Sequence, residues 1–224
     1  MSLGHFHHLG DIMSAYRLLA ALIGWGALAL QYWLMMNADA PTDPVNRTIN
    51  FFSYFTILTN ILVALAMTAP LLAPNSRIGR FFDKPGVRTA IATYIIVVSV
   101  TYHLLLRDLW DPQGLQKIAD YTLHYGTPAL FVLDWLLFVP KRDVPWSAAF
   151  KALGYPIVYL AWTLYHGTWS GFYPYPFVDV GQLGMEKVLI NSGAMTAAFI
   201  VLCLVLIALG KILSRLVGDR TQAA

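Results

Sequence analysis

The sequence predicts an all-α polytopic membrane protein, a bundle of six transmembrane helices that forms a single domain over residues 1–224. Of the 224 residues, 58% are hydrophobic and only 12% are charged, and the mean hydropathy is +0.58. A water-soluble domain of this size would leave too much apolar surface in contact with water. Long apolar runs joined by short polar loops are the pattern that a bilayer requires.

Six apolar runs have about the 20-residue length that crosses a bilayer. They fall at residues 15–33, 51–69, 89–106, 121–139, 147–165 and 188–209. A break in the sequence follows each run except the last, which ends in a basic tail. The breaks are Pro41–Pro44, Pro70, Asp111–Gly114, Pro140 and the aromatic stretch His166–Pro176. The first run lacks a small-residue cleavage site after it, so we expect a retained helix and no removed targeting segment.

Positive charge is divided unevenly between the two sides of the predicted bundle. One side holds eleven basic residues, Arg17, Arg77, Arg80, Lys84, Arg88, Lys141, Arg142, Lys151, Lys211, Arg215 and Arg220; the other holds Arg47, Arg107, Lys117 and Lys187. The positive-inside rule places the richer side, and with it both termini, in the cytoplasm. We therefore expect a multi-pass protein of the plasma (inner) membrane.

The charge and cysteine content of the chain limit the kinds of partner and metal site that we expect. The formal net charge of +3 is too small to suggest nucleic acid, so the expected partners are the bilayer and a membrane lipid. The one cysteine, Cys203, lies in an apolar run, which indicates neither a disulfide nor a thiolate metal cluster. The sequence leaves the oligomeric state open.

Four ionisable residues within or at the ends of the spans are candidates for function, because an unpaired polar group costs several kcal/mol in hydrocarbon. They are His103, His124, Asp134 and His166. The predicted topology places all three histidines toward the outer face. Asp134 lies about 15 Å deeper than His124 on an ideal helix. It cannot orient that imidazole, and we expect it to be protonated or hydrogen-bonded to a neighbouring helix, with a proton path as the alternative.

The second span carries a polar seam. At about 100° per residue, Ser53, Thr56 and Asn60 share one stripe, with Thr59 at its flank. Thr56 and His124 lie about 8 Å and 5 Å below the outer ends of their spans, so their depths permit contact. The alternative is that the threonine bonds its own preceding turn or holds helices together.

Three segments resemble the androgen-induced-gene membrane proteins, of which this chain looks like a bacterial relative. They are residues 52–60 (FSYFTILTN), 123–134 (LHYGTPALFVLD) and 165–177 (YHGTWSGFYPYPF). Members of that family have about six spans and include hydrolases of fatty acid esters of hydroxy fatty acids. The resemblance implies Thr56 as nucleophile, with Thr59 as the alternative, and His124 as the histidine. The chain departs from the family pattern at residues 120–123 and at Tyr165, where the family has further histidines.

The implied chemistry is intramembrane hydrolysis of a fatty-acyl ester by a threonine hydrolase that uses no cofactor and no metal. A threonine hydroxyl needs a base within about 3 Å, and a neutral imidazole at His124 is such a base. Donors to the oxyanion are expected among Asn60, Tyr54, Tyr125 and His103, which the sequence does not rank.

Two other functions fit the same residues. His103, His124 and His166 are potential ligands of a metal or haem, although no H-x-x-x-H or H-E-x-x-H spacing occurs. Alternatively, the polar seam and Asp134 line a lipid or ion pathway in a protein that is not an enzyme. No internal repeat and no matching pair of interrupted helices supports a transporter.

Overall fold

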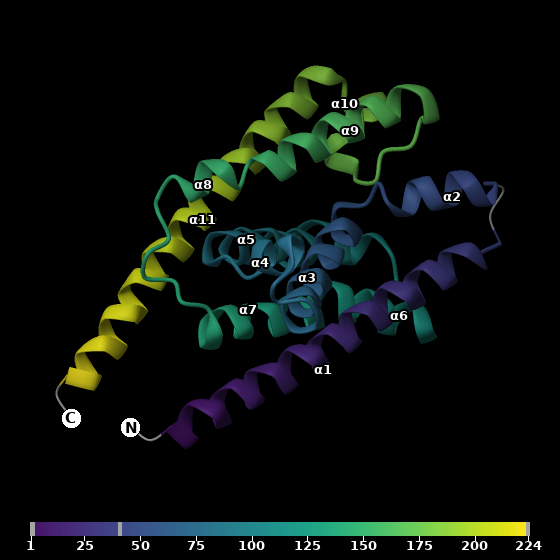
Figure 1. Cartoon of the computed structure of the whole chain (residues 1–224). Coiled ribbons are helices and arrows are strands. Elements are labelled where there is room, and N and C mark those ends of the chain that lie inside the picture. Colours follow the sequence, from purple (N-terminus) through teal and green to yellow (C-terminus); the bar gives the residue numbers. More distant parts are fainter. Residues whose placement is uncertain (1–2, 40–41, 223–224) are drawn as a thin grey trace.

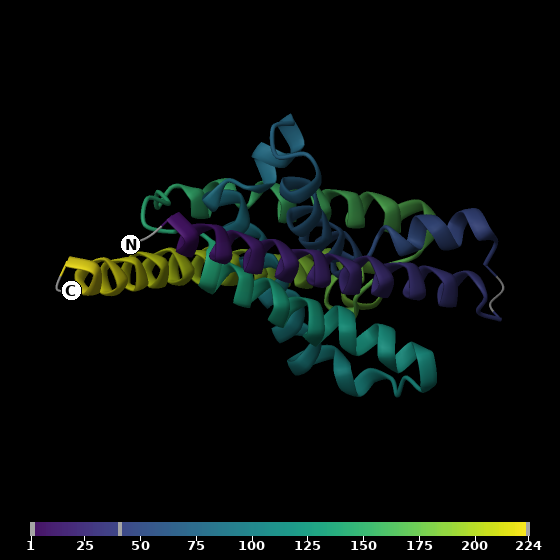
Figure 2. The same ribbon diagram turned by 60° about the horizontal axis from the view of Figure 1, so that its bottom comes forward.

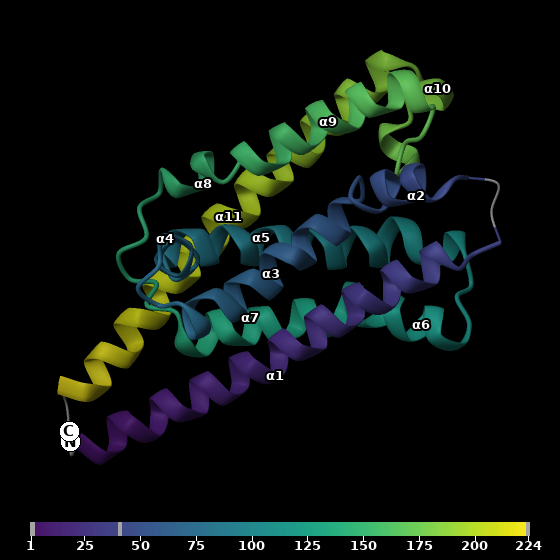
Figure 3. The same cartoon turned by 45° about the vertical axis from the view of Figure 1, so that its right-hand side comes forward.

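The computed structural model describes residues 3–39 and 42–222, and the side chains of residues 10–39 and 42–216. All regular structure in these residues is helical, which confirms that the fold is all-α. Long helices run back and forth along a common axis, and the start of α1 and the end of α11 lie at the same end of the bundle (Figures 1 and 3).

The helices follow one another with short connections. The α-helices are α1 (Leu3–Met36), α2 (Pro44–Phe51), α3 (Phe55–Leu72), α4 (Arg77–Phe82), α5 (Pro85–Thr101), α6 (Gly114–Tyr121), α7 (Thr127–Phe138), α8 (Ala148–Lys151), α9 (Gly154–Ser170), α10 (Val180–Leu183) and α11 (Met185–Gln222). Two π-helical turns, η1 (Tyr102–Leu106) and η3 (Thr122–Gly126), continue α5 and join α6 to α7; η2 (Arg107–Leu109) and η4 (Pro176–Val178) are 3-10 turns. Seen from another side, α4 (blue) projects from the bundle opposite α6 (teal; Figure 2).

Four helical segments are long and apolar enough to cross a membrane. They are Gly10–Met36, Phe55–Leu72, Pro85–Leu109 and Met185–Leu216, and they correspond to the first, second, third and sixth predicted spans. The fourth predicted span contains the π turn η3, and the helix of the fifth, α9, has 17 residues. Neither of these two segments reaches both the length and the hydropathy of the other four.

The second predicted span, 51–69, is wrong at its outer end, because the chain leaves the helix between α2 and α3. Asp43 caps α2, which ends at Phe51. The Ser53 amide then bonds the Asn50 carbonyl and its hydroxyl donates to the Ile49 carbonyl. Ser53 is therefore not on one helical stripe with Thr56, which lies in the first turn of α3.

Aromatic rings pack the first turn of α3 against its neighbours. The Phe55 ring stacks on Tyr155 of α9 at a centroid distance of 5.0 Å and meets the edge of Phe199 of α11 at 5.7 Å. Tyr94 of α5 lies 4.9 Å from the same Tyr155 ring. Such pairs contribute about 0.5–1.5 kcal/mol each beyond burial, so the backbone next to Phe55 is held firmly.

Asp134 is buried between two arginines from other helices. Its carboxylate accepts from Arg17 Nε of α1 at 2.7 Å and from an Arg88 terminal nitrogen of α5 at 2.5 Å, and it is 0% exposed. These ion pairs satisfy a carboxylate that would otherwise cost several kcal/mol to bury. The expected bond to a neighbouring helix is present, but its partners are two arginines that the charge analysis had assigned to the membrane edge.

The end of the bundle that carries Asp134 is also the basic end. There Lys141 donates to the Trp135, Leu136 and Val139 carbonyls at the end of α7, and Lys211 of α11 donates to the Arg142 carbonyl. Arg17, Arg88 and Lys141 are buried, so these three of the eleven basic residues are bonded within the protein. The side chain of Arg220 lies outside the described residues.

Candidate active site

The hydroxyl of Thr56 and the imidazole of His124 lie in contact, as the compatible depths of the two residues allow. Thr56 Oγ1 lies 3.4 Å from His124 Nε2 and 3.2 Å from the Tyr175 hydroxyl. The Thr56 hydroxyl thus engages two other segments and does not simply satisfy the turn before it. A separation somewhat longer than the roughly 2.6–3.2 Å of a working nucleophile–base pair is common in ligand-free sites.

The π turn η3 presents His124 to α3. Pro128 has no backbone N–H, and the Thr127 amide bonds the Thr122 carbonyl five residues back. The Leu123 carbonyl then accepts from the Asn60 side-chain nitrogen at 3.1 Å, and the Thr127 hydroxyl donates to the Asn60 oxygen. Asn60 therefore ties α3 to the turn that carries His124.

Asp120, which the sequence analysis did not identify as functional, orients His124. His124 Nδ1 lies 3.2 Å from Asp120 Oδ1 and 2.9 Å from the Asp120 carbonyl oxygen, and the carboxylate is 3% exposed. Both neighbours are acceptors, so we assign the proton to Nδ1, which leaves the Nε2 lone pair facing Thr56. The contacts from Thr56 through His124 to Asp120 have the order of a hydroxyl, an imidazole and a carboxylate that, in hydrolases, act as nucleophile, base and acid.

Tyr102 supports the carboxylate and the imidazole together. Its ring stacks on His124 with centroids 3.9 Å apart and planes 15° from parallel, and its hydroxyl donates to Asp120 Oδ2. Tyr102 belongs to η1, so both π turns contribute to the site. Locally widened helical turns recur at functional sites, where they re-aim side chains.

Tyr175, the second residue that the sequence analysis missed, reaches Thr56 from the connection between α9 and α10. Its hydroxyl accepts from the Thr56 amide at 3.1 Å, a donor with no partner within α3 because it lies in the first turn. Burial raises the pKa of Tyr175 to about 12, so the phenol keeps its proton at neutral pH.

The connection that carries Tyr175 is held tightly in place. It begins at Gly171, whose φ of +68° suits glycine, and Tyr173 lies so close to Gly167 that a Cβ there would stand 2.1 Å from its ring. Tyr175 is extended before Pro176, as a residue before proline favours. Asn191 of α11 donates to the Phe177 carbonyl at 2.9 Å.

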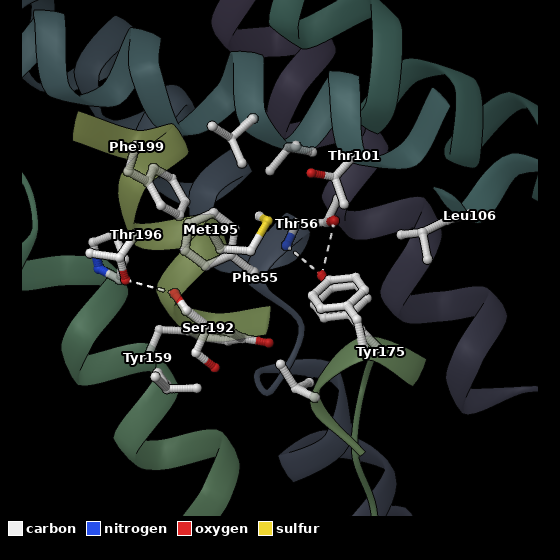
Figure 4. Close-up of a pocket in the computed structure, with 16 residues that line it drawn as sticks. Phe55, Thr56, Thr101, Leu106, Tyr159, Tyr175, Ser192, Met195, Thr196 and Phe199 are labelled. Carbon is white, nitrogen blue, oxygen red and sulfur yellow. Dashed lines mark hydrogen bonds between the residues drawn. The ribbon is translucent and has the colours of Figure 1, made fainter. Parts of the chain in front are cut away.

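Thr56 and Tyr175 form one wall of an apolar cavity of about 90 Å³ (Figure 4). The other walls come from α3, α5, α9 and α11, and include Phe55, Val98, Pro156, Leu160, Met195 and Phe199. Most of its lining is apolar, which suits an apolar group that approaches the Thr56 hydroxyl.

A larger and more polar depression lies beside Tyr102. It has a volume of about 640 Å³ and is lined by Tyr102, Tyr121, Tyr125, Arg107, Asp108 and Asp111, together with Leu109, Trp110 and Pro112. The Tyr102 ring also stacks on His124. Thr56 therefore lines the apolar cavity, and a ring in contact with His124 lines the polar one.

The remaining predicted residues have other partners. His103 Nδ1 contacts the Tyr125 hydroxyl at 3.1 Å, and Arg107 lies 3.1 Å from His103 Nε2. Tyr54 packs its ring against the edge of Tyr175. The Thr59 hydroxyl, the alternative nucleophile, bonds the Tyr155 hydroxyl at 3.0 Å, which leaves Thr56 as the threonine beside a histidine.

Ser53 and His166 form a second hydroxyl–imidazole contact, 3.5 Å long, away from Thr56. The Ser53 hydroxyl donates to the Ile49 carbonyl and accepts from Trp162 Nε1 at 3.0 Å. With its proton used in this way, Ser53 is a connector between the α2–α3 break and α9. His166, 1% exposed, stacks on Trp162.

The three histidines lie in separate environments, bonded to Tyr125, Asp120 and Ser53 respectively. Within the part of the chain that the structure describes, no three His, Cys, Asp or Glu side chains are grouped to hold a metal ion. The metal or haem alternative thus lacks a converging ligand set. Asp134, closed in by Arg17 and Arg88, lines neither cavity.

Comparisons with models of protein families, with curated proteins and with solved structures find no match for this chain.

Proposed function

We propose that this protein is an intramembrane hydrolase of fatty-acyl esters, with Thr56 as nucleophile and His124 as base. The observation that carries the proposal is the series of contacts from Thr56 through His124 to Asp120 at the wall of an apolar cavity. Burial, a base and an orienting acid beside a hydroxyl are the arrangement that activates a weak nucleophile.

The reaction is an acyl transfer in two halves. Thr56 Oγ1 attacks the ester carbonyl carbon while its proton passes to His124 Nε2, and the same proton then leaves with the alcohol as the old ester bond breaks. Water next attacks the acyl-threonine, gives a proton to His124, and the collapse of the adduct returns that proton to Thr56. Asp120 accepts from Nδ1–H and stabilises the imidazolium in both halves.

The two cavities suit the two sides of an ester. The acyl chain enters the apolar cavity between α3, α5, α9 and α11, and water and the alcohol product use the polar depression beside Tyr102. Fatty acid esters of hydroxy fatty acids, the substrates that the family resemblance implies, belong to this class.

We further propose that all six predicted spans cross the membrane, with both termini in the cytoplasm and the site toward the outer face. The path α6–η3–α7 is helical without a break from Gly114 to Phe138, and in Figure 3 α9 points in the same general direction as α11. In that view α2, α6 and α10 lie at the end of the bundle opposite α4, the helix with two of the eleven basic residues, Arg77 and Arg80 (Figure 3). The richer basic side should face the cytoplasm.

The test is turnover of para-nitrophenyl fatty-acyl esters by the full chain purified in detergent. We expect Thr56→Ala and His124→Ala each to lower kcat by about 10³-fold or more. Thr59→Ala is the matched control, because it removes a buried threonine hydroxyl one turn further along α3 that bonds Tyr155 and no histidine. It should keep turnover close to that of the wild type.

A fluorophosphonate probe identifies the nucleophile independently. We expect a single adduct that peptide mass spectrometry maps to Thr56 and that Thr56→Ala abolishes. Full turnover by folded Thr56→Ala and His124→Ala proteins, or labelling that survives Thr56→Ala, would show that the proposed mechanism is wrong.

A further inference from the structure

We propose that the Tyr175 hydroxyl and the backbone N–H of Thr56 together bind the oxyanion that forms when Thr56 attacks an ester. This inference rests on the proposed hydrolase function and adds to it a catalytic residue from the α9–α10 connection. None of the four oxyanion donors expected from the sequence is this tyrosine.

Only one assignment of donors and acceptors is consistent with all the hydrogen bonds around Thr56. His124 Nδ1–H faces Asp120, so Nε2 is an acceptor and the Thr56 hydroxyl donates to it. The Thr56 amide can only donate, and it donates to the Tyr175 oxygen. The Tyr175 proton is then directed to Thr56 Oγ1, at 3.2 Å.

The same two donors are placed to meet an oxyanion. In the tetrahedral adduct the oxyanion is two bonds from Thr56 Oγ1, on the cavity side where the substrate carbonyl enters. In the free protein the Thr56 N–H donates to the Tyr175 oxygen, and the Tyr175 hydroxyl points to Thr56 Oγ1 (Figure 4). A small shift of the Tyr175 hydroxyl lets both donors bind the oxyanion instead. A nucleophile whose own backbone N–H binds the oxyanion is a known solution for acyl transfer.

The donors expected from the sequence are committed elsewhere. The Asn60 side-chain nitrogen donates to the carbonyls of Thr56 and Leu123. The hydroxyl of Tyr125 and the ring of His103 bond each other. Tyr54 presents its ring to Tyr175, which leaves Tyr175 as the side-chain donor in contact with the nucleophile.

Oxyanion donors must be held in position before the reaction, and the α9–α10 connection holds Tyr175 in this way. Pro174 and Pro176 flank Tyr175, Tyr173 packs on Gly167, and the Tyr175 ring stacks on Phe177 with planes 2° from parallel. Little motion is needed when charge develops on the substrate oxygen.

The experiment compares Tyr175→Phe with the wild type in ester turnover and in binding of a trifluoromethyl ketone, which forms a covalent tetrahedral oxyanion on the nucleophile. We expect Tyr175→Phe to lower kcat by about 10²- to 10³-fold with little change in KM. Affinity for the ketone should fall by a similar factor, while affinity for the matching methylene analogue, which has no carbonyl, should stay constant.

Tyr165→Phe is the matched control, since it removes a hydroxyl from α9 where Tyr165 is 64% exposed and is not among the residues that line the Thr56 cavity, and it should retain turnover. Thr56→Ala is assayed in parallel. If Thr56→Ala is inactive and Tyr175→Phe keeps kcat and ketone affinity within about threefold of the wild type, the oxyanion proposal is overturned and the hydrolase proposal stands. If Thr56→Ala keeps full activity, both are overturned.

Folding of Tyr175→Phe is checked by thermal unfolding in detergent. If that variant misfolds, 3-fluorotyrosine at position 175 supplies a second one, because its hydroxyl is more acidic and its ring nearly unchanged in size. Tighter ketone binding by this variant would support donation from Tyr175, and unchanged binding would contradict it.

Discussion

His124 Nδ1 lies 3.2 Å from Asp120 Oδ1, one helical turn earlier on the same helical path. This spacing lets a single segment supply both the base and its orienting carboxylate. The Tyr102 hydroxyl donates to the other carboxylate oxygen, so the acid is held from a second segment. The carboxylate of Asp120 therefore determines which ring nitrogen of His124 faces Thr56.

Asp120→Asn should therefore lower kcat by about 10²- to 10⁴-fold with little change in KM. An amide nitrogen facing Nδ1 favours the tautomer whose Nε2 carries the proton, and that tautomer cannot accept from Thr56. Ester turnover by the purified protein measures the loss. Asp143→Asn is the control, because Asp143 is exposed in the α7–α8 connection. Equal kcat in the two variants would remove Asp120 from the mechanism.

The effect of Tyr175 should not depend on pH over the working range. Burial raises its pKa to about 12, so the phenol stays protonated where an ordinary tyrosine, with a pKa of about 10, begins to ionise. We expect the ratio of wild-type kcat to Tyr175→Phe kcat to be constant between about pH 6 and pH 10. A ratio that collapses toward one as pH approaches 10 would contradict a protonated donor.

The raised pKa of Tyr175 should also make the stability of the protein depend on pH above about pH 10. Above about pH 10 an unfolded tyrosine loses its proton while folded Tyr175 keeps it, so the unfolded state binds fewer protons. The contribution of Tyr175 to stability is complete below pH 10 and is lost as pH rises toward its folded pKa of about 12. Thermal unfolding across this range should show a steeper decline for the wild type than for Tyr175→Phe.

Hydropathy predicted the all-helical fold and four helices long and apolar enough to cross a membrane. Helical spacing indicated that Thr56 and His124 lie at compatible depths, because depth in a span depends only on counting residues from its end. Ser53 was misplaced, since the break after Phe51 arises from local hydrogen bonds of Ser53 that leave no trace in hydropathy. Asp120 lies one position before the fourth predicted span and is not among the predicted site residues, although its spacing of four from His124 is a usable signal. Tyr175 lies in a connection without helical periodicity, so periodicity does not single it out.

The partners of Asp134 show a second limit on what a sequence can predict. The positive-inside rule treats each arginine as an independent charge at the membrane edge, whereas Arg17 and Arg88 turn inward to one carboxylate. Pairing between residues 117 positions apart in the chain depends on which helices are neighbours, and a single sequence does not contain that information. Only the need of Asp134 for a partner could be predicted.

Asp134→Asn should destabilise the protein strongly and leave the chemistry of folded molecules unchanged. The substitution leaves buried Arg88 without its bonded carboxylate and leaves Arg17 with only the exposed Asp83, at a cost of about 3–5 kcal/mol. Asp83→Asn is the matched control, because Asp83 also faces Arg17, at 3.7 Å, but is 60% exposed, and such pairs contribute about 0–1 kcal/mol. Thermal unfolding in detergent measures both. Equal losses would mean that the buried pairs do not stabilise the bundle.

Gly167→Ala should impair turnover although residue 167 contacts neither Thr56 nor His124. The new methyl would overlap the Tyr173 ring and push the connection that carries Tyr175 away from the nucleophile. A displacement of about 1 Å at a catalytic group can cost about 10²-fold in rate. In the control, Gly193→Ala, the methyl meets no atom within 4 Å, and kcat should be unchanged. Wild-type turnover by Gly167→Ala would show that the position of the connection is unimportant.

Met195 should affect the length of acyl chain that the site accepts. Met195 of α11 lines the cavity that Thr56 also lines (Figure 4), and truncation to alanine adds volume that a longer acyl chain can fill. We expect Met195→Ala to shift the maximum of kcat/KM in a para-nitrophenyl ester series toward longer chains. Each methylene that gains an apolar contact is worth about 0.8 kcal/mol, or roughly fourfold. Val201→Ala shortens a side chain of the same helix that is 60% exposed and should leave the chain-length profile unchanged. A profile that responds to neither substitution would place the acyl chain outside this cavity.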